Sequence, residues 1–155
     1  MNHPEKAAMM LSKRATLALL SACLLTVSPA MPQTVKPDYP LNMSPVDAAR
    51  LVAEKKVILI DIRRPEEWQE TGVAENAHKL DMNDPLFSTK LSKLMDGDRT
   101  KSIALICRTA TRTRVVQQAL LQSGYSSVIN VEGGMIGNAA DKGWINHGLP
   151  VVKGE

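Results

Sequence analysis

The chain has 155 residues, enough for one domain with its own core but short for two ordinary domains. Its formal net charge is +3, and three basic residues against one acidic residue give residues 1–30 a net charge of +2. The remaining body is therefore nearly neutral and lacks the clustered Lys and Arg of a nucleic-acid-binding protein.

The first thirty residues have the pattern of a secretory signal peptide. Lys13 and Arg14 end a polar stretch, and the uncharged, mostly apolar run Ala15–Val27 follows. Ser28–Ala30 then supplies the small residues at which a signal peptidase cleaves. The apolar run has 13 residues, fewer than the roughly 20 that cross a bilayer, so no membrane span is expected. The pattern predicts export to the periplasm, with residues 1–30 as the signal peptide.

An alternative form of export depends on Cys23. Leu20–Cys23 (LSAC) resembles a bacterial lipoprotein cleavage box, and a lipidated Cys23 would anchor the protein to a membrane. We favour the soluble form, because the apolar run continues past Cys23, where mature lipoproteins turn polar. In both cases the folded body keeps one thiol, Cys107, which cannot form an internal disulfide.

Residues 31–42 contain three prolines and no periodicity, which predicts a linker or an N-terminal arm on the domain surface. The domain itself is expected over residues 43–155. A helix is predicted to follow Ser44, a suitable N-cap, with Pro45 at its first position. Val57–Ile62 (VILIDI) is a near-continuous apolar run rich in β-branched residues, typical of a strand buried on both faces.

The same signals continue to the end of the chain. They predict three further helices: one that begins at Pro65 and ends at Gly72, one over Ser88–Met95 and one over Arg114–Gly124. They also predict two further strands, over Lys101–Cys107 and Ser126–Val131. Short apolar strands that alternate with helices predict a doubly wound α/β fold, with a mostly parallel central sheet and helices on both faces. Functional groups in such sheets gather beyond the carboxyl ends of strands, where Cys107 lies.

Cys107 opens the stretch Cys107–Thr113 (CRTATRT), which holds hydroxyl residues and two arginines but no acidic residue. At the mouth of a helix, unpaired N–H groups and the helix dipole favour a thiolate over a thiol. Arg108 would add positive potential, and Arg112 can bind an oxyanion through two N–H groups. Three small residues would let the backbone N–H groups curl around an anion: Thr109, Ala110 and Thr111.

Two interpretations of Cys107 are open on these residues alone. Free Cys is among the most buried residue types, so Cys107 could be an inert residue at the end of a strand. Its arginines could then be solvated or paired with Asp61 and Glu66. The positions of Arg108 and Arg112 beside the thiol favour the second interpretation, a reactive nucleophile.

Three blocks of the chain, in order, resemble the single-domain rhodanese family of sulfurtransferases. Cys107–Thr113 is similar to the family's loop, Cys-Arg-x-Gly-x-Arg-Ser/Thr, with Ala110 in place of Gly. Leu59–Gly72 (LIDIRRPEEWQETG) is similar to the family's opening signature. Val131–Gly134 and Gly143–Val151 are similar to its closing signature. The resemblance implies a rhodanese-like fold for the body of the chain.

The chain departs from the family pattern in three places. Val73–Lys79 replaces the usual His-Ile-Pro-Gly-Ala-x-Asn run, so the rim of the site is expected to differ there in shape and charge. Ala110 would be strained if the loop needs a positive φ at its position. Residues 135–143 lengthen the segment before Trp144, which predicts an extra loop.

The resemblance implies a two-step transfer through a Cys107 persulfide. Cys107 would take a sulfane sulfur from a donor such as thiosulfate and pass it to a thiol or to cyanide, with no metal or organic cofactor. Residues of the loop would bind the donor: Arg108, Thr109, Ala110, Thr111, Arg112 and Thr113. Asp61 is expected near the loop, where it would orient an arginine, and Arg63 is a weaker supporting residue. The protein is expected to be a monomer.

Other functions stay as alternatives. Phosphatases and arsenate reductases on related folds have one more residue between Cys and Arg, whereas four residues separate Cys107 from Arg112, which favours a sulfur guest. A non-catalytic binding module is less favoured, because inactive family members have lost the Cys. The histidines show no metal-ligand spacing, and Glu66, Glu67 and Glu70 are expected to form a solvated helix face.

Overall fold

The structure is a computed structural model that describes residues 38–154. The predicted signal peptide, the Cys23 lipoprotein box and residues 31–37 of the predicted arm lie outside the described residues. The described strands are β1 (Asn42–Met43), β2 (Ile58–Asp61), β3 (Val73–Ala74), β4 (His78–Lys79), β5 (Ile103–Ile106), β6 (Val128–Val131) and β7 (Val151–Val152). The described helices are α1 (Pro45–Ala53), α2 (Pro65–Thr71), α3 (Phe87–Leu94), α4 (Thr111–Gln122) and a 3₁₀ helix (Ile145–His147).

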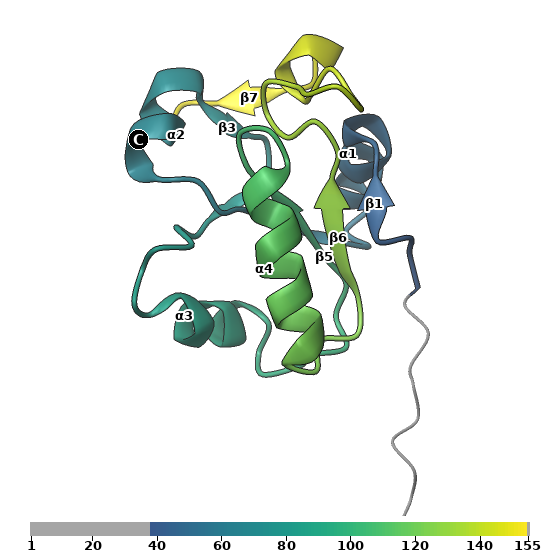
Figure 1. Ribbon diagram of the computed structural model, residues 1–155, viewed down its shortest axis with the longest axis vertical. Helices are drawn as coiled ribbons and strands as arrows, with labels where there is room; N and C mark the ends of the chain where they lie inside the picture. The colour runs from purple at the N-terminus through teal and green to yellow at the C-terminus, as the bar shows by residue number, and fades with distance from the viewer. Residues whose placement is uncertain (1–37, 155) are drawn as a thin grey trace, which may run out of the picture. The chain divides into compact units, whose positions relative to one another are not determined.

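Five strands form one parallel sheet in the order β1-β6-β5-β2-β4 (Figure 1). β5 pairs with β2 along its length, and Ile106 at its end lies opposite Asp61. Asp61 is therefore on the strand beside the one that leads into Cys107. β3 and β7 form a separate antiparallel pair. The predicted α/β fold with a mostly parallel central sheet is confirmed.

Helices cover both faces of this sheet, as predicted. On one face, Leu51 of α1 packs in a cluster with Leu59 and Ile106 of the strands. On the other face, Leu91 of α3 and Val116 of α4 belong to a second cluster with the alternate strand residues. Figure 1 shows α4 running across the sheet in front of β5. The near-continuous apolar strands are explained by this burial on both sides.

Local signals set the ends of the first two helices. The hydroxyl of Ser44 accepts a hydrogen bond from the N–H of Asp47 at 3.1 Å, and Pro45 is the first residue of α1. α2 begins at Pro65 and ends before Gly72, which has a φ of 76°. These helix ends agree with the predictions.

The start of α4 differs from the prediction. The helix was expected from Arg114, but it begins three residues earlier, at Thr111. Ala110 has a left-handed backbone conformation, with φ 65° and ψ 6°, and this turns the chain into the helix immediately after the loop. As a result Arg112 and Thr113 lie on the first turn of α4.

The end of the predicted arm is part of the sheet. Asn42, its last residue, lies in β1, so the predicted boundary at residue 43 falls inside a strand. The carbonyl of Leu41 accepts hydrogen bonds from the N–H of Asn130 at 2.8 Å and from Nε2 of Gln117 at 2.6 Å. These bonds join residues 41–43 to β6 and α4.

Candidate active site at the Cys107 loop

Cys107 directly follows β5, and only 1% of its surface is exposed. It is a free cysteine within the described residues. Its Sγ lies 3.7 Å from Oγ1 of Thr113. Because Thr113 is on the first turn of α4, the strand, loop and helix together place a hydroxyl beside the sulfur.

The loop needs a left-handed residue at Ala110, the position where the family prefers Gly. Its φ of 65° lies in the region that side chains with a Cβ rarely adopt. This conformation costs an L-residue roughly 1–2 kcal/mol. The side chain is also fully buried. The loop therefore keeps the curled conformation with Ala, at the expense of local strain.

Three carbonyls of the loop are held by the segment that follows β6. The carbonyls of residues 107–109 accept hydrogen bonds, in that order, from Met135 N at 2.8 Å, Ile136 N at 3.1 Å and Asn138 Nδ2 at 2.9 Å. In a trans peptide the C=O and the following N–H point in opposite directions. The N–H groups of residues 108–110 are therefore directed away from this segment. Asn138 lies in the predicted extra loop and was not among the predicted site residues.

Gly134 is required by its contact with the Cys107 loop. A Cβ at this position would lie 2.4 Å from the carbonyl oxygen of Cys107 and 2.8 Å from the carbonyl carbon of Arg108. The φ of Gly134 is also positive, at 59°. The second glycine of the VEGG block thus allows the segment after β6 to approach the loop closely enough to bind its carbonyls.

The backbone N–H groups of residues 108–112 have no hydrogen-bond acceptor within residues 38–154. The N–H groups in the first turn of any helix have no acceptor inside that helix. Here they precede and begin a helix of twelve residues, α4. They are thus available as donors to an anionic sulfur species. That they form such a cradle around the Cys107 sulfur stays a prediction.

A buried hydrogen-bond chain continues from the sulfur into the sheet. Oγ1 of Thr113 donates to Oδ1 of Asn130 at 2.5 Å, and Nδ2 of Asn130 donates to Oδ1 of Asn42 at 3.0 Å. The Thr113 proton is therefore directed at Asn130, which leaves a lone pair of its oxygen for Cys107. Asn130 was not among the predicted site residues. It could have been found as the polar residue inside the otherwise apolar strand β6.

Arg112 makes a two-point ion pair with Glu67 of α2. Nη1 donates to Oε2 at 2.7 Å and Nη2 donates to Oε1 at 2.5 Å. The hydrogen bonds from Arg112 are the main reason that the pKa of Glu67 is lowered to about 2, against the opposing effect of burial. Glu67 is buried, so the prediction of a solvated position was wrong for it, while Glu66 and Glu70 are exposed.

Arg112 also interacts with Cys107. Its pKa is raised above the ordinary value, first by the hydrogen bonds to Glu67 and to a smaller extent by Cys107. The guanidinium is thus paired with a carboxylate and close enough to the sulfur to interact with it. This arrangement fixes Arg112 in place and offsets its positive charge.

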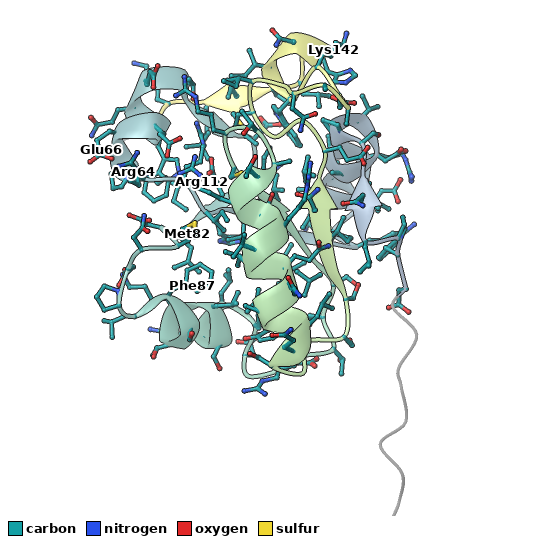
Figure 2. All side chains as sticks on the ribbon, viewed as in Figure 1. Arg64, Glu66, Met82, Phe87, Arg112 and Lys142 are labelled. Atoms are coloured by element: carbon teal, nitrogen blue, oxygen red, sulfur yellow. The ribbon has the colours of Figure 1, made fainter. Side chains whose placement is uncertain are left out.

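The surface around Arg112 is a charged depression of about 510 Å³. It is lined by three arginines and three glutamates: Arg64, Arg108, Arg112, Glu66, Glu67 and Glu70. Arg108 pairs with Glu70 at 3.2 Å, and both side chains are exposed. Figure 2 shows Arg64 and Glu66 on the same side of the molecule as Arg112, whereas Lys142 lies away from them.

Asp61 and Arg63 form a buried pair that supports α2 rather than the Cys107 loop. Arg63 Nη2 lies 2.7 Å from Asp61 Oδ2, and its Nε donates to both carboxylate oxygens. The other guanidinium N–H groups bind the carbonyls of Glu67 and Gly72 and the hydroxyl of Thr71. Asp61 thus orients an arginine of its own segment, and this arginine holds the helix that carries Glu67.

Within residues 38–154, no group of three or more His, Cys, Asp or Glu side chains is arranged to hold a metal ion. Nε2 of His147 lies 2.9 Å from Oδ1 of Asp141, outside the Cys107 loop. None of the helices over the same residues has the length and apolar character of a membrane span. That the protein needs no cofactor stays a prediction.

Comparison with known proteins agrees with this fold. A rhodanese-like domain model matches residues 44–140. A sulfurtransferase from Allochromatium vinosum is 32% identical over 106 residues, which cover 68% of this chain and 88% of that protein. The polysulfide-sulfur transferase homodimer from Wolinella succinogenes is 30% identical, with a TM-score of 0.54 over 72% of this chain and 77% of that chain.

A thiosulfate sulfurtransferase from Pseudomonas aeruginosa has a TM-score of 0.59 at 20% identity, over 77% of this chain and 21% of that chain, and it supports the fold alone. The parallel sheet and the cysteine loop between a strand and a helix define a class of α/β domains with a cysteine at the end of a central strand. Since the family model covers more than half of the chain, this protein belongs to the rhodanese-like domain family.

Proposed function

We propose that this protein is a rhodanese-type sulfurtransferase that carries a sulfane sulfur as a Cys107 persulfide. The observation that supports this most directly is the position of Cys107 at the end of β5, where it interacts with Arg112. The five residues that follow it have backbone N–H groups with no acceptor within residues 38–154. The sulfurtransferase relative at 32% identity supports the same class.

The first step loads the enzyme. The Cys107 thiolate attacks the outer sulfur of thiosulfate, a sulfur–sulfur bond forms on Cys107, and the old sulfur–sulfur bond breaks to release sulfite. Written in full, Cys–S⁻ and S–SO₃²⁻ give Cys–S–S⁻ and SO₃²⁻. The N–H groups of residues 108–112 would stabilise the negative charge on the persulfide.

The second step unloads it. The persulfide Cys–S–S⁻ first takes up a proton from water to give Cys–S–SH. A thiolate R–S⁻ then attacks the outer sulfur of Cys–S–SH, which gives R–S–SH and returns Cys–S⁻. With cyanide as the acceptor, the products are thiocyanate, the Cys107 thiolate and a proton. Covalent catalysis of this kind predicts ping-pong kinetics, because the sulfur leaves its donor before the acceptor binds.

Thiocyanate formation from thiosulfate and cyanide tests this proposal. We expect Cys107→Ser to reduce the reaction to background, because a hydroxyl cannot carry the sulfur. Cys23→Ser is the matched control and should retain activity. Full activity in Cys107→Ser would overturn the proposal. The phosphatase or arsenate-reductase alternative predicts turnover of an aryl phosphate or of arsenate, with no thiocyanate.

We also propose that the protein is exported to the periplasm. The proposal is supported by the charged, apolar and small-residue pattern of residues 1–30, which lie outside the described residues. Cell fractionation should find a soluble periplasmic protein that lacks these residues. A membrane-bound form that becomes soluble in Cys23→Ser would instead support the lipoprotein alternative.

A further inference from the structure

We infer that Glu67 is a specificity-determining residue that disfavours small sulfur dianions such as thiosulfate and so selects organic persulfides as sulfur donors. The inference rests on the proposed function, in which Cys107 takes up a sulfane sulfur. It goes beyond that function by naming the class of donor and the residue that selects it.

The carboxylate of Glu67 already occupies the part of Arg112 that would bind an oxyanion. Two N–H groups of the guanidinium are directed at its two oxygens. The backbone N–H of Arg64 binds the same carboxylate at 3.1 Å, so Glu67 is held from both sides. Its side chain is only 10% exposed, and Arg112 keeps it ionised with a pKa of about 2. A sulfonate-like group would have to displace this carboxylate or lie beside it.

The other arginines of the depression are also paired. Arg108 lies 3.2 Å from Glu70, and Nε of Arg64 lies 3.8 Å from Glu67. With Glu66, the six charged side chains that line the depression sum to zero. A site that attracts a dianion needs a net positive charge, and this one offers only balanced charges.

An organic persulfide avoids this repulsion. In its transfer step the thiolate of Cys107 and R–S–SH give Cys–S–SH and R–S⁻, so the leaving group carries one negative charge rather than two. The organic group R can lie in the depression, whose volume of about 510 Å³ is of the size that holds small organic ligands, about 300–1,000 Å³. Only the outer sulfur has to reach Cys107.

The test compares two donors in single-turnover loading of the full chain. Mass spectrometry gives the rate constant for the addition of one sulfur to Cys107, with thiosulfate and with 2-hydroxyethyl persulfide as the probes. We expect Glu67→Gln to raise the ratio of the thiosulfate rate constant to the persulfide rate constant by about tenfold or more, since one negative charge beside the bound dianion is removed. Glu75→Gln removes one exposed carboxylate that does not line the depression, and should change the ratio by less than about twofold.

A second variant covers the case in which Glu67→Gln does not fold. Arg112→Gln leaves the carboxylate of Glu67 without its partner, so the ratio should fall by about tenfold or more. If the ratio is unchanged in the variants that fold, or if it changes equally in Glu75→Gln, the inference is overturned and the proposed function still stands. If wild-type protein takes up sulfur from neither donor, the proposed function itself is wrong.

Discussion

Ala110 is the residue of the site with the clearest local cost. Its left-handed conformation is unfavourable for an L-residue, and Gly adopts it freely. Gly also increases the conformational entropy of the unfolded chain, which offsets about 0.4–1 kcal/mol of the stability gained by removing the strain. Gly also removes a fully buried methyl group, which is worth about 0.8 kcal/mol. Ala110→Gly should therefore change the free energy of unfolding by less than about 1 kcal/mol in either direction.

Urea denaturation measures this effect, and Ala104→Gly is the matched control. Ala104 is equally buried but lies inside β5, where Gly weakens the strand and has no methyl group to pack. The free energy of unfolding of Ala104→Gly should fall by about 1 kcal/mol or more. An equal loss of stability in both variants would show that the Ala110 position is not strained.

Glu67 makes stability depend on pH in a defined range. Its pKa is lowered from 4.5 to about 2 in the folded protein, mainly by Arg112, so the ionised carboxylate stabilises the fold above pH 4.5. This contribution is lost as the pH falls from about 4.5 to about 2, and the shift corresponds to about 3 kcal/mol.

Unfolding experiments between pH 2 and pH 6 on wild-type protein and Glu67→Gln measure this contribution. The difference in free energy of unfolding between the two proteins should be largest near pH 6 and should diminish toward pH 2. A difference that stays constant across this range would exclude the Arg112 pair as a pH-dependent source of stability.

At the scale of elements, the segment after β6 determines the shape of the Cys107 loop. Gly134→Ala would place a Cβ 2.4 Å from the carbonyl oxygen of Cys107, against backbone that cannot move aside without disturbing the loop. We expect a loss of more than about 2 kcal/mol in the free energy of unfolding and a marked loss of sulfur loading.

Gly97→Ala is the control for backbone conformation alone. Gly97 also has a positive φ, of 74°, but no atom lies within 4 Å of a Cβ built there. Gly97→Ala should lower the free energy of unfolding by about 1 kcal/mol and leave sulfur loading of Cys107 unchanged. If Gly134→Ala loses no more stability and no more loading than Gly97→Ala, the close approach to the loop has no functional importance.

For the whole molecule, the parts that follow from local patterns could be predicted from the sequence. The apolar strands, the cap at Ser44 and the end of a strand just before Cys107 depend on neighbouring residues, and the structure has them where they were expected. The start of α4 was misplaced because it depends on the left-handed conformation of Ala110, which Ala rarely adopts.

The contacts that shape the site could not be predicted in the same way. Glu67 and Arg112 are 45 positions apart, and they meet only because α2 and α4 are brought together by the sheet. Likewise, Thr113 contacts Asn130 of β6, and Asn138 binds the loop from a segment that looked like an insertion. The balanced charge around Arg112 therefore becomes visible only in the folded structure.

The central claim is that Cys107 carries the transferred sulfur, and peptide mass mapping tests it most directly. The full chain would be incubated with thiosulfate or 2-hydroxyethyl persulfide, freed of excess donor and digested. We predict one added sulfur atom on the peptide that contains Cys107, none on the peptide that contains Cys23, and return of the original mass after treatment with cyanide. No added sulfur on Cys107 from either donor, or sulfur found on Cys23 instead, would contradict the claim.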